Sequence, residues 1–156
     1  MSKSLTRVRR ALSEAGLSVD ILETGADTRT AAQAAEIACC NLDQIAKSII
    51  FRGETTTAAI LFLTAGGNRV DPDKAAICAG ELLGKADAAL IRAQTGFAIG
   101  GVSPVGHLNP VRAFLDPRLM EFETVWAAAG TPHHIFPIAP TELHRITAAQ
   151  LADFTA

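Results

Sequence analysis

The hydrophobic residues near the start of the chain follow a helical period. Leu5, Val8 and Leu12 recur three and four positions apart, which places them on one face of a helix over residues 4–15. Gly16 follows directly and is a suitable C-terminal cap. The pattern therefore predicts an amphipathic first helix whose other face carries charged residues.

Apolar runs further along the chain have lengths typical of buried strands. Residues 47–51 and 58–64 are rich in Ile, Leu and Phe, and the segment between them has the composition of a hairpin turn. A helix precedes the first run, because Thr30 and Gln33 have the spacing of a capping box, and it extends to about residue 38. We therefore expect a helix followed by two adjacent buried strands.

Glycine and proline mark the boundaries of the remaining elements. Asp71 and Pro72 open a helix that runs to residue 79, and residues 85–95 have a helical pattern closed by Gly96. This alternation of elements predicts an α/β or α+β fold with a mixed sheet, in one domain. The further elements expected are short strands over residues 19–22, 111–115, 124–128 and 135–138, and two short helices, one after Pro140 and one capped by Thr147.

Bulk composition limits the class of partner. The 156-residue chain has a mass of 16.4 kDa, 49% hydrophobic residues, a net charge of −2 and a pI near 6.1. These values allow a sizeable core and disfavour general coating of nucleic acid, but they leave room for a local basic patch that binds an RNA end. Lys3, Arg7, Arg9 and Arg10 form either a solvated face or such a contact. No apolar stretch has the length of a signal or a membrane span, so we expect no membrane partner. We also expect no DNA partner, since the net negative charge disfavours general binding of nucleic acid.

The cysteines and histidines match no disulfide or metal pattern. Cys39, Cys40 and Cys78 give an odd count with one adjacent pair, which favours the reducing cytoplasm. A reactive thiol at Cys39 or Cys40 is an alternative, and it would need a resolving cysteine nearby. The histidines lack the spacing of a zinc site, so we expect no metal and no other cofactor.

The glycine-rich segment over residues 95–107 is the first candidate for a function. It is neither a Walker A loop nor a dinucleotide fingerprint, and Ser103 lacks the Gly-x-Ser-x-Gly context of a hydrolase nucleophile. Residues 100–104 could present backbone N–H and C=O groups to a small substrate, or they could form a tight structural turn.

Lys47 is the second candidate, because it opens the apolar run Ser48–Phe51. Its stem could lie on apolar surface while the ammonium stays in water. Its charge could instead point into a cleft and hold a phosphate or a carboxylate. The pattern alone leaves both interpretations open.

These motifs belong to a longer series that runs in one order over residues 28–145. The series comprises Thr30–Ala35, Gln44–Ser48, Val70–Lys74, the glycine-rich loop Thr95–Gly106, Ala129–Gly130 and Pro140–Leu143. In this order the chain resembles the YbaK/ProX family of free-standing aminoacyl-tRNA deacylases, which is related to the editing insertion of bacterial prolyl-tRNA synthetases.

The resemblance implies a fold, a reaction and roles for several residues. The fold is α+β, a single domain over residues 1–156 with a mixed, barrel-like sheet flanked by helices. The reaction is hydrolysis of the ester that joins a wrong small amino acid, such as Ala, Ser, Thr or Cys, to the 3′ end of a tRNA, in particular tRNA-Pro. Lys47 would bind the terminal phosphate, and Gly100, Gly101 and Ser103 would orient the ester and the attacking hydroxyl or water.

Partners and specificity follow less directly. An aminoacyl-tRNA synthetase is a further candidate partner, and a non-catalytic module that binds a tRNA end or a nucleotide is the alternative function. Residues 130–134 differ from the glycine- and charge-rich turn of the cysteine-specific branch, and His107 is closer to branches that remove other small amino acids. We expect the aminoacyl group to contact Ile49, Val102, Pro104, His107 and His134.

Overall fold

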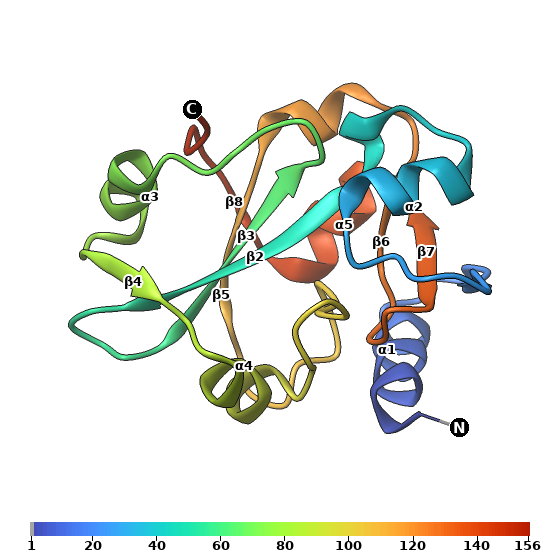
Figure 1. Cartoon of the computed structure of the whole chain (residues 1–156), viewed down its shortest axis with the longest axis horizontal. Coiled ribbons are helices and arrows are strands. Elements are labelled where there is room, and N and C mark those ends of the chain that lie inside the picture. Colours follow the sequence, from blue (N-terminus) through green and yellow to red (C-terminus); the bar gives the residue numbers. More distant parts are fainter. Residues whose placement is uncertain (1) are drawn as a thin grey trace.

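The computed structural model describes residues 2–156 and arranges them as two sheets flanked by helices (Figure 1). The larger sheet has five strands in the order β4-β2-β3-β5-β8, and the smaller has three in the order β1-β7-β6. The strands are β1 (Leu22–Glu23), β2 (Ala46–Gly53), β3 (Ala59–Ala65), β4 (Leu83–Lys85), β5 (Arg112–Leu115), β6 (Val125–Ala128), β7 (His134–Ile138) and β8 (Gln150–Leu151). The helices are α1 (Lys3–Glu14), α2 (Ala31–Ala38), α3 (Pro72–Ala79), α4 (Ala88–Thr95) and α5 (Pro140–Thr147), with 3₁₀ turns η1 (Leu42–Gln44) and η2 (Pro117–Glu121).

The larger sheet is mixed, as predicted. β2 pairs antiparallel with β3 from Ala46↔Ala65 to Arg52↔Ala59, whereas β3 pairs with β5 in parallel. A parallel bridge between Ile45 and Trp126 brings the start of β2 to the smaller sheet. The two sheets are therefore barrel-like without forming a closed barrel, and the α+β class expected from the resemblance is confirmed.

Alternation along β3 divides the core into two layers. Leu61 and Leu63 face a cluster that includes Leu12 of α1 and Phe136 of β7, so both sheets share this core. The opposite face of β3 contributes Phe62 to a second cluster, in which its ring stacks on Phe114 with the centroids 5.1 Å apart.

Local capping signals fix the helix starts that the sequence indicates. Thr30 and Gln33 form both bonds of the capping box at α2. Asp71 caps α3 by accepting from the Asp73 amide, and Pro72 occupies the first turn. These bonds satisfy amide groups that would otherwise lack acceptors at the start of a helix.

Three predicted elements were wrong in position or type. Residues 19–22 do not form the expected strand, because only Leu22 and Glu23 pair with β7. Lys85 pairs with Phe51 of β2 as the end of β4, and the helix predicted from residue 85 begins after Asp87, whose carboxylate caps it.

The third correction concerns the helix that Thr147 was expected to cap. The Thr147 hydroxyl donates to the Leu143 carbonyl at 2.7 Å and so closes α5 instead of opening a new helix. The chain then continues into β8, which pairs in parallel with β5.

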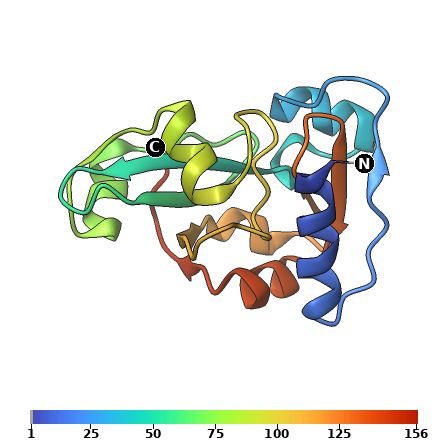
Figure 2. The same ribbon diagram turned by 90° about the horizontal axis from the view of Figure 1, so that it is seen from below.

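In Figure 1 the N-terminus lies at the lower right, below α1, and the C-terminus lies at the upper edge, near α3. Seen from below in Figure 2, α1 lies beside the smaller sheet, next to the segment that follows α4. Within residues 2–156, no helix is both long enough and apolar enough to cross a membrane.

Candidate functional site

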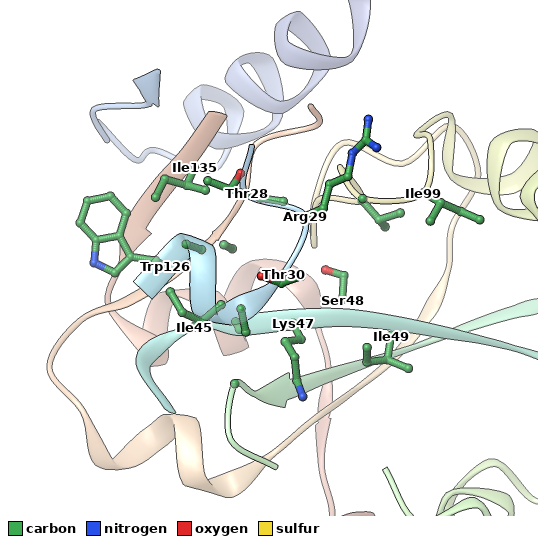
Figure 3. A pocket seen from close by; sticks show the side chains of 18 of the residues that line it. Thr28, Arg29, Thr30, Ile45, Lys47, Ser48, Ile49, Ile99, Trp126 and Ile135 are labelled. Atoms are coloured by element: carbon green, nitrogen blue, oxygen red, sulfur yellow. The ribbon is translucent and has the colours of Figure 1, made fainter. Parts of the chain in front are cut away.

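A cavity of about 640 Å³ lies where β2, α2, the glycine-rich loop and the smaller sheet meet (Figure 3). This volume is within the range of about 300–1,000 Å³ that is typical of small-molecule sites. Its walls are mostly small or aliphatic, among them Ala31, Ala34, Ile45, Ala127 and Ile135. The cavity joins the two segments that the sequence singled out, because Lys47 and Gly100 both line it.

Ser48 points into this cavity from β2 (Figure 3). Its hydroxyl is buried and has no protein hydrogen-bond partner among the described residues. An unpaired buried hydroxyl costs free energy, and a ligand with a polar group at this position would remove that cost. Nothing in the sequence pattern distinguishes Ser48 from the other residues of this apolar strand.

The ammonium of Lys47 lies on the other side of the same strand. Its stem lines the cavity, while its Nζ donates to the Asn68 carbonyl at 2.5 Å and points away from Ser48 in Figure 3. Burial lowers the pKa of Lys47 from its ordinary value, and the Arg69 charge lowers it further, whereas Asp116 and Asp43 act in the opposite direction. One of the three donors of the ammonium is thus committed to the protein.

Asp116 holds the turn that carries Asn68. The residue is 3% exposed, and its Oδ2 accepts from the Ala65 amide at 3.1 Å and from the Asn68 Nδ2 at 2.9 Å. Its Oδ1 accepts from the Arg118 amide at 2.9 Å. The carboxylate therefore ties the end of β3 to η2 and fixes the carbonyl that Lys47 contacts.

Gly100 and Val102 bring the glycine-rich loop to the cavity wall. Gly100 has a φ of +91°, a conformation that favours glycine. Within residues 2–156, the amides of Gly100 and Val102 donate to no protein acceptor, whereas the Gly101 amide donates to the Ala98 carbonyl at 3.1 Å. Two backbone donors of the loop are therefore available to a ligand.

Gly101 and Ser103 stabilise the loop without lining the cavity. A Cβ at Gly101 would lie 2.8 Å from the Thr131 Cα, so only glycine allows the loop to approach the turn between β6 and β7 this closely. Ser103 is fully buried, and its hydroxyl accepts from the Val105 amide at 3.2 Å. Its side chain thus stabilises a turn and does not line the cavity.

Ile49 and Val102 line the cavity as expected, but the other predicted substrate contacts do not. Pro104 and His107 line a separate depression beside α5. The His107 Nε2 donates to the Ser103 carbonyl at 2.7 Å, and burial lowers the pKa of the imidazole. His134 bonds the Thr131 hydroxyl through its Nδ1 at 2.6 Å. The placement gives no support to Pro104, His107 or His134 as contacts of the aminoacyl group.

The segment Thr28–Thr30 forms a wall of the cavity that no motif in the sequence indicates. The Thr28 hydroxyl donates to the Pro132 carbonyl at 2.6 Å, which fastens the segment to the turn between β6 and β7. A Cβ at Gly100 would lie 2.9 Å from the Arg29 Cγ, so the Arg29 stem covers the loop at the cavity rim. The capping box at Thr30 marked the helix start but not its proximity to the loop.

Trp126 lines the cavity from β6. It is the single tryptophan of a chain that contains no tyrosine. Its fluorescence therefore reports on this cavity without interference from another indole or phenol.

The three cysteines lie outside the cavity lining. All are free, with Cys39 exposed and Cys40 and Cys78 half-buried. Burial raises the pKa of the Cys40 thiol, and the neighbouring Cys39 raises it further. A raised pKa reduces the thiolate fraction, which disfavours Cys40 as a nucleophile.

Comparison with known proteins identifies the family. Residues 25–146 match the family described as the aminoacyl-tRNA editing domain. The chain belongs to this family. Its relatives include the uncharacterized protein YwhH of Bacillus subtilis (strain 168), which is 34% identical over 140 residues, covering 90% of this chain and 88% of that protein.

Two solved structures are similar to the chain over almost its whole length. One is described as "a putative trans-editing enzyme for prolyl tRNA synthetase"; it is 44% identical, with a TM-score of 0.92, and the match covers 100% of this chain and 99% of that one. The hypothetical protein APE2540 is 25% identical with a TM-score of 0.88, over 96% of this chain and 99% of that one. The cavity described above thus lies in an aminoacyl-tRNA editing domain.

Proposed function

We propose that this chain hydrolyses the ester between a small amino acid and the 3′ end of a mischarged tRNA. The observation that carries the proposal is the cavity in which the Lys47 stem, the Ser48 hydroxyl and the free amides of the glycine-rich loop meet in an editing domain. We further propose tRNA-Pro as the substrate, since a relative that matches the whole chain is named for prolyl-tRNA synthetase.

The wall composition favours a small aminoacyl group. Alanines on α2 and β6, with Ile45 and Ile135 between them, form an apolar surface without an acidic side chain. Alanine is the best match, and serine, threonine and cysteine are the other candidates. We place the aminoacyl group between Trp126 and α2, where exclusion of larger side chains by size is the simplest basis for selectivity.

Backbone donors supply the chemistry in this proposal. The ester carbonyl lies against the amides of Gly100 and Val102, which stabilise the negative charge that develops when water attacks. The Ser48 hydroxyl bonds the substrate or the attacking water. The bond between the carbonyl carbon and the 2′- or 3′-oxygen of the terminal ribose then breaks, and this oxygen takes up a proton from the attacking water. The free amino acid and the intact tRNA are the products.

Lys47 holds the terminal phosphate in the same proposal. Its ammonium keeps one donor on the Asn68 carbonyl and offers the other two to phosphate oxygens of a tRNA end that passes this side of β2. An aminoacyl ester is already labile, so fixing its position against a few oriented dipoles supplies a large part of the rate. The reaction therefore needs no nucleophilic side chain.

The first test compares turnover with binding. Wild-type protein is mixed in excess with tRNA-Pro charged with alanine, and release of alanine is measured beside the spontaneous hydrolysis of the same ester. Quenching of the Trp126 fluorescence by a non-hydrolysable 3′-amide analogue of alanyl-adenosine reports occupancy of the cavity. Faster release together with quenching supports the proposal. Quenching without faster release would contradict hydrolysis and favour a non-catalytic module that binds the tRNA end.

A further inference from the structure

Arg7 of α1 contacts both ends of the glycine-rich loop. Its Nη2 donates to the Gly96 carbonyl at 2.7 Å, and its Nε donates to the Gly106 carbonyl at 3.2 Å. The guanidinium also lies over the Phe97 ring, 4.9 Å from the centroid. Arg7 therefore binds the residues that enclose the segment supplying Gly100 and Val102 to the cavity.

The fit between α1 and the loop is close. A Cβ at Gly96 would lie 2.5 Å from the Arg7 Nη2, and a Cβ at Gly106 would lie 3.1 Å from the Arg7 backbone carbonyl. On the same helix, Arg9 and Arg10 are exposed, whereas Arg7 is half-buried. At Gly106 the loop thus approaches the backbone of α1 closely, and at Gly96 the Arg7 guanidinium occupies the space beside the loop.

The Arg7 guanidinium donates its hydrogen bonds to backbone carbonyls, which carry no net charge. Within residues 2–156, no carboxylate forms an ion pair with this guanidinium. The Gly96 carbonyl belongs to the C-terminal cap of α4, where the helix dipole favours a cation. A planar guanidinium offers several donors in a fixed fork, so a single side chain can bridge two carbonyls in a way that an ammonium cannot.

We propose that Arg7 is a positioning residue for the editing reaction. It does not line the cavity, and it acts by holding the loop so that the amides of Gly100 and Val102 keep their orientation toward the ester. This inference rests on the proposed function. It assigns to the first helix a role in the chemistry that needs no contact between its exposed arginines and RNA.

The test uses Arg7→Gln and Arg7→Lys, with Arg9→Gln and Arg10→Gln as matched controls on the same helix. Hydrogen–deuterium exchange over residues 97–106 reports the order of the loop, and single-turnover release of alanine reports the reaction. For Arg7→Gln we expect faster amide exchange in this segment. We also expect the maximal single-turnover rate to fall about tenfold or more, while the protein concentration that gives half of this rate changes much less, because misplaced groups slow chemistry more than binding. Arg7→Lys recovers part of the rate, and both controls behave as wild type.

Chemical rescue separates positioning from a general loss of stability. In Arg7→Ala, guanidinium at non-denaturing millimolar concentration should restore part of the rate, whereas sodium chloride of equal ionic strength should not. Wild-type exchange and rate in Arg7→Gln would overturn the inference. So would a loss of rate that follows the loss of folded protein and is not rescued by guanidinium. An inactive wild type would refute the proposed function instead, and the exchange data would still show whether Arg7 orders the loop.

Discussion

At Lys47, the two parts of one side chain lie in different surroundings. The stem lines an apolar cavity, and the ammonium is fixed to the Asn68 carbonyl on the other side of β2. The stem therefore lies on apolar surface, as in the first interpretation that the sequence left open, whereas the ammonium does not point into the cavity. A role in phosphate binding depends on the donors that Asn68 leaves free.

Replacing Lys47 tests that role. Lys47→Ala should lower single-turnover deacylation by about tenfold to a hundredfold while leaving the urea midpoint close to wild type, because a phosphate contact is lost and no core side chain is removed. Lys47→Arg should restore only part of the rate, since the planar fork does not fit the position of a compact ammonium. Lys85→Ala, at an exposed position of β4, is the control and should retain full activity. Unchanged activity in Lys47→Ala would remove this residue from the site.

Gly101 matters because it has no side chain, which lets the loop lie close to the turn between β6 and β7. Gly101→Ala places a methyl group 2.8 Å from the Thr131 Cα, which should cost about 1–3 kcal/mol of unfolding free energy and displace the loop, with a clear loss of activity. Gly80→Ala introduces strain at a φ of +78° with no atom within 4 Å, and it lies at the end of α3 outside the cavity lining. It should lose stability but keep its activity. Equal activity losses in both variants would mean that stability alone is being measured.

His107 gives the protein a specific response to acid. Burial holds its folded-state pKa below the ordinary value, so the unfolded chain takes up the proton first as the pH falls. Stability is then complete above the unfolded pKa and is lost as the pH falls through it toward the folded pKa. Between about pH 7.5 and about pH 5.5, the urea midpoint of wild type should fall more than that of His107→Asn. An equal fall in the two proteins would contradict this explanation.

At the scale of elements, the turn after β3 depends on one buried carboxylate. Asp116→Ala removes the acceptor of three hydrogen bonds, from Ala65, Asn68 and Arg118, and should lower the unfolding free energy by about 3 kcal/mol. The exposed pair of Asp153 with Lys74 at 3.3 Å provides the control, since Asp153→Ala should cost less than about 1 kcal/mol. Urea unfolding measures both values. Costs of similar size would show that the Asp116 network does not stabilise the turn.

Local signals in the sequence explain which elements could be predicted. The capping pairs at Thr30 and Asp71 and the apolar runs of β2 and β3 depend on near neighbours, and all appear in the structure. The prediction for Thr147 was wrong because a threonine hydroxyl can bond a carbonyl of the preceding helix as well as cap a following one. The pairing of β8 with β5, which the local sequence does not indicate, leaves no room for a following helix. Lys85 was placed in a helix because its partner Phe51 is distant in the sequence.

At the scale of the whole molecule, the cavity arises from segments that no local pattern connects. The resemblance to a family of deacylases predicted that Lys47 and the glycine-rich loop share a site, and both line the cavity. It did not predict the wall from Thr28 to Thr30, the position of Trp126, or the contact of Arg7 with the loop. Each of these depends on the packing of α1 and the smaller sheet, which residue spacing does not specify. His107 was assigned to the site by its sequence position next to the loop, yet it lies in a different depression.

The most direct measurement compares one tRNA carrying different amino acids. tRNA-Pro is charged separately with alanine, proline and phenylalanine, and the single-turnover rate of ester hydrolysis is measured with wild-type protein in excess. A difference of one methylene in an apolar pocket changes a rate by only about 10- to 200-fold, so strong discrimination indicates exclusion by shape. We predict rapid release of alanine, with proline and phenylalanine released near the spontaneous rate. Equal acceleration of all three esters would contradict an editing function and indicate an unselective esterase.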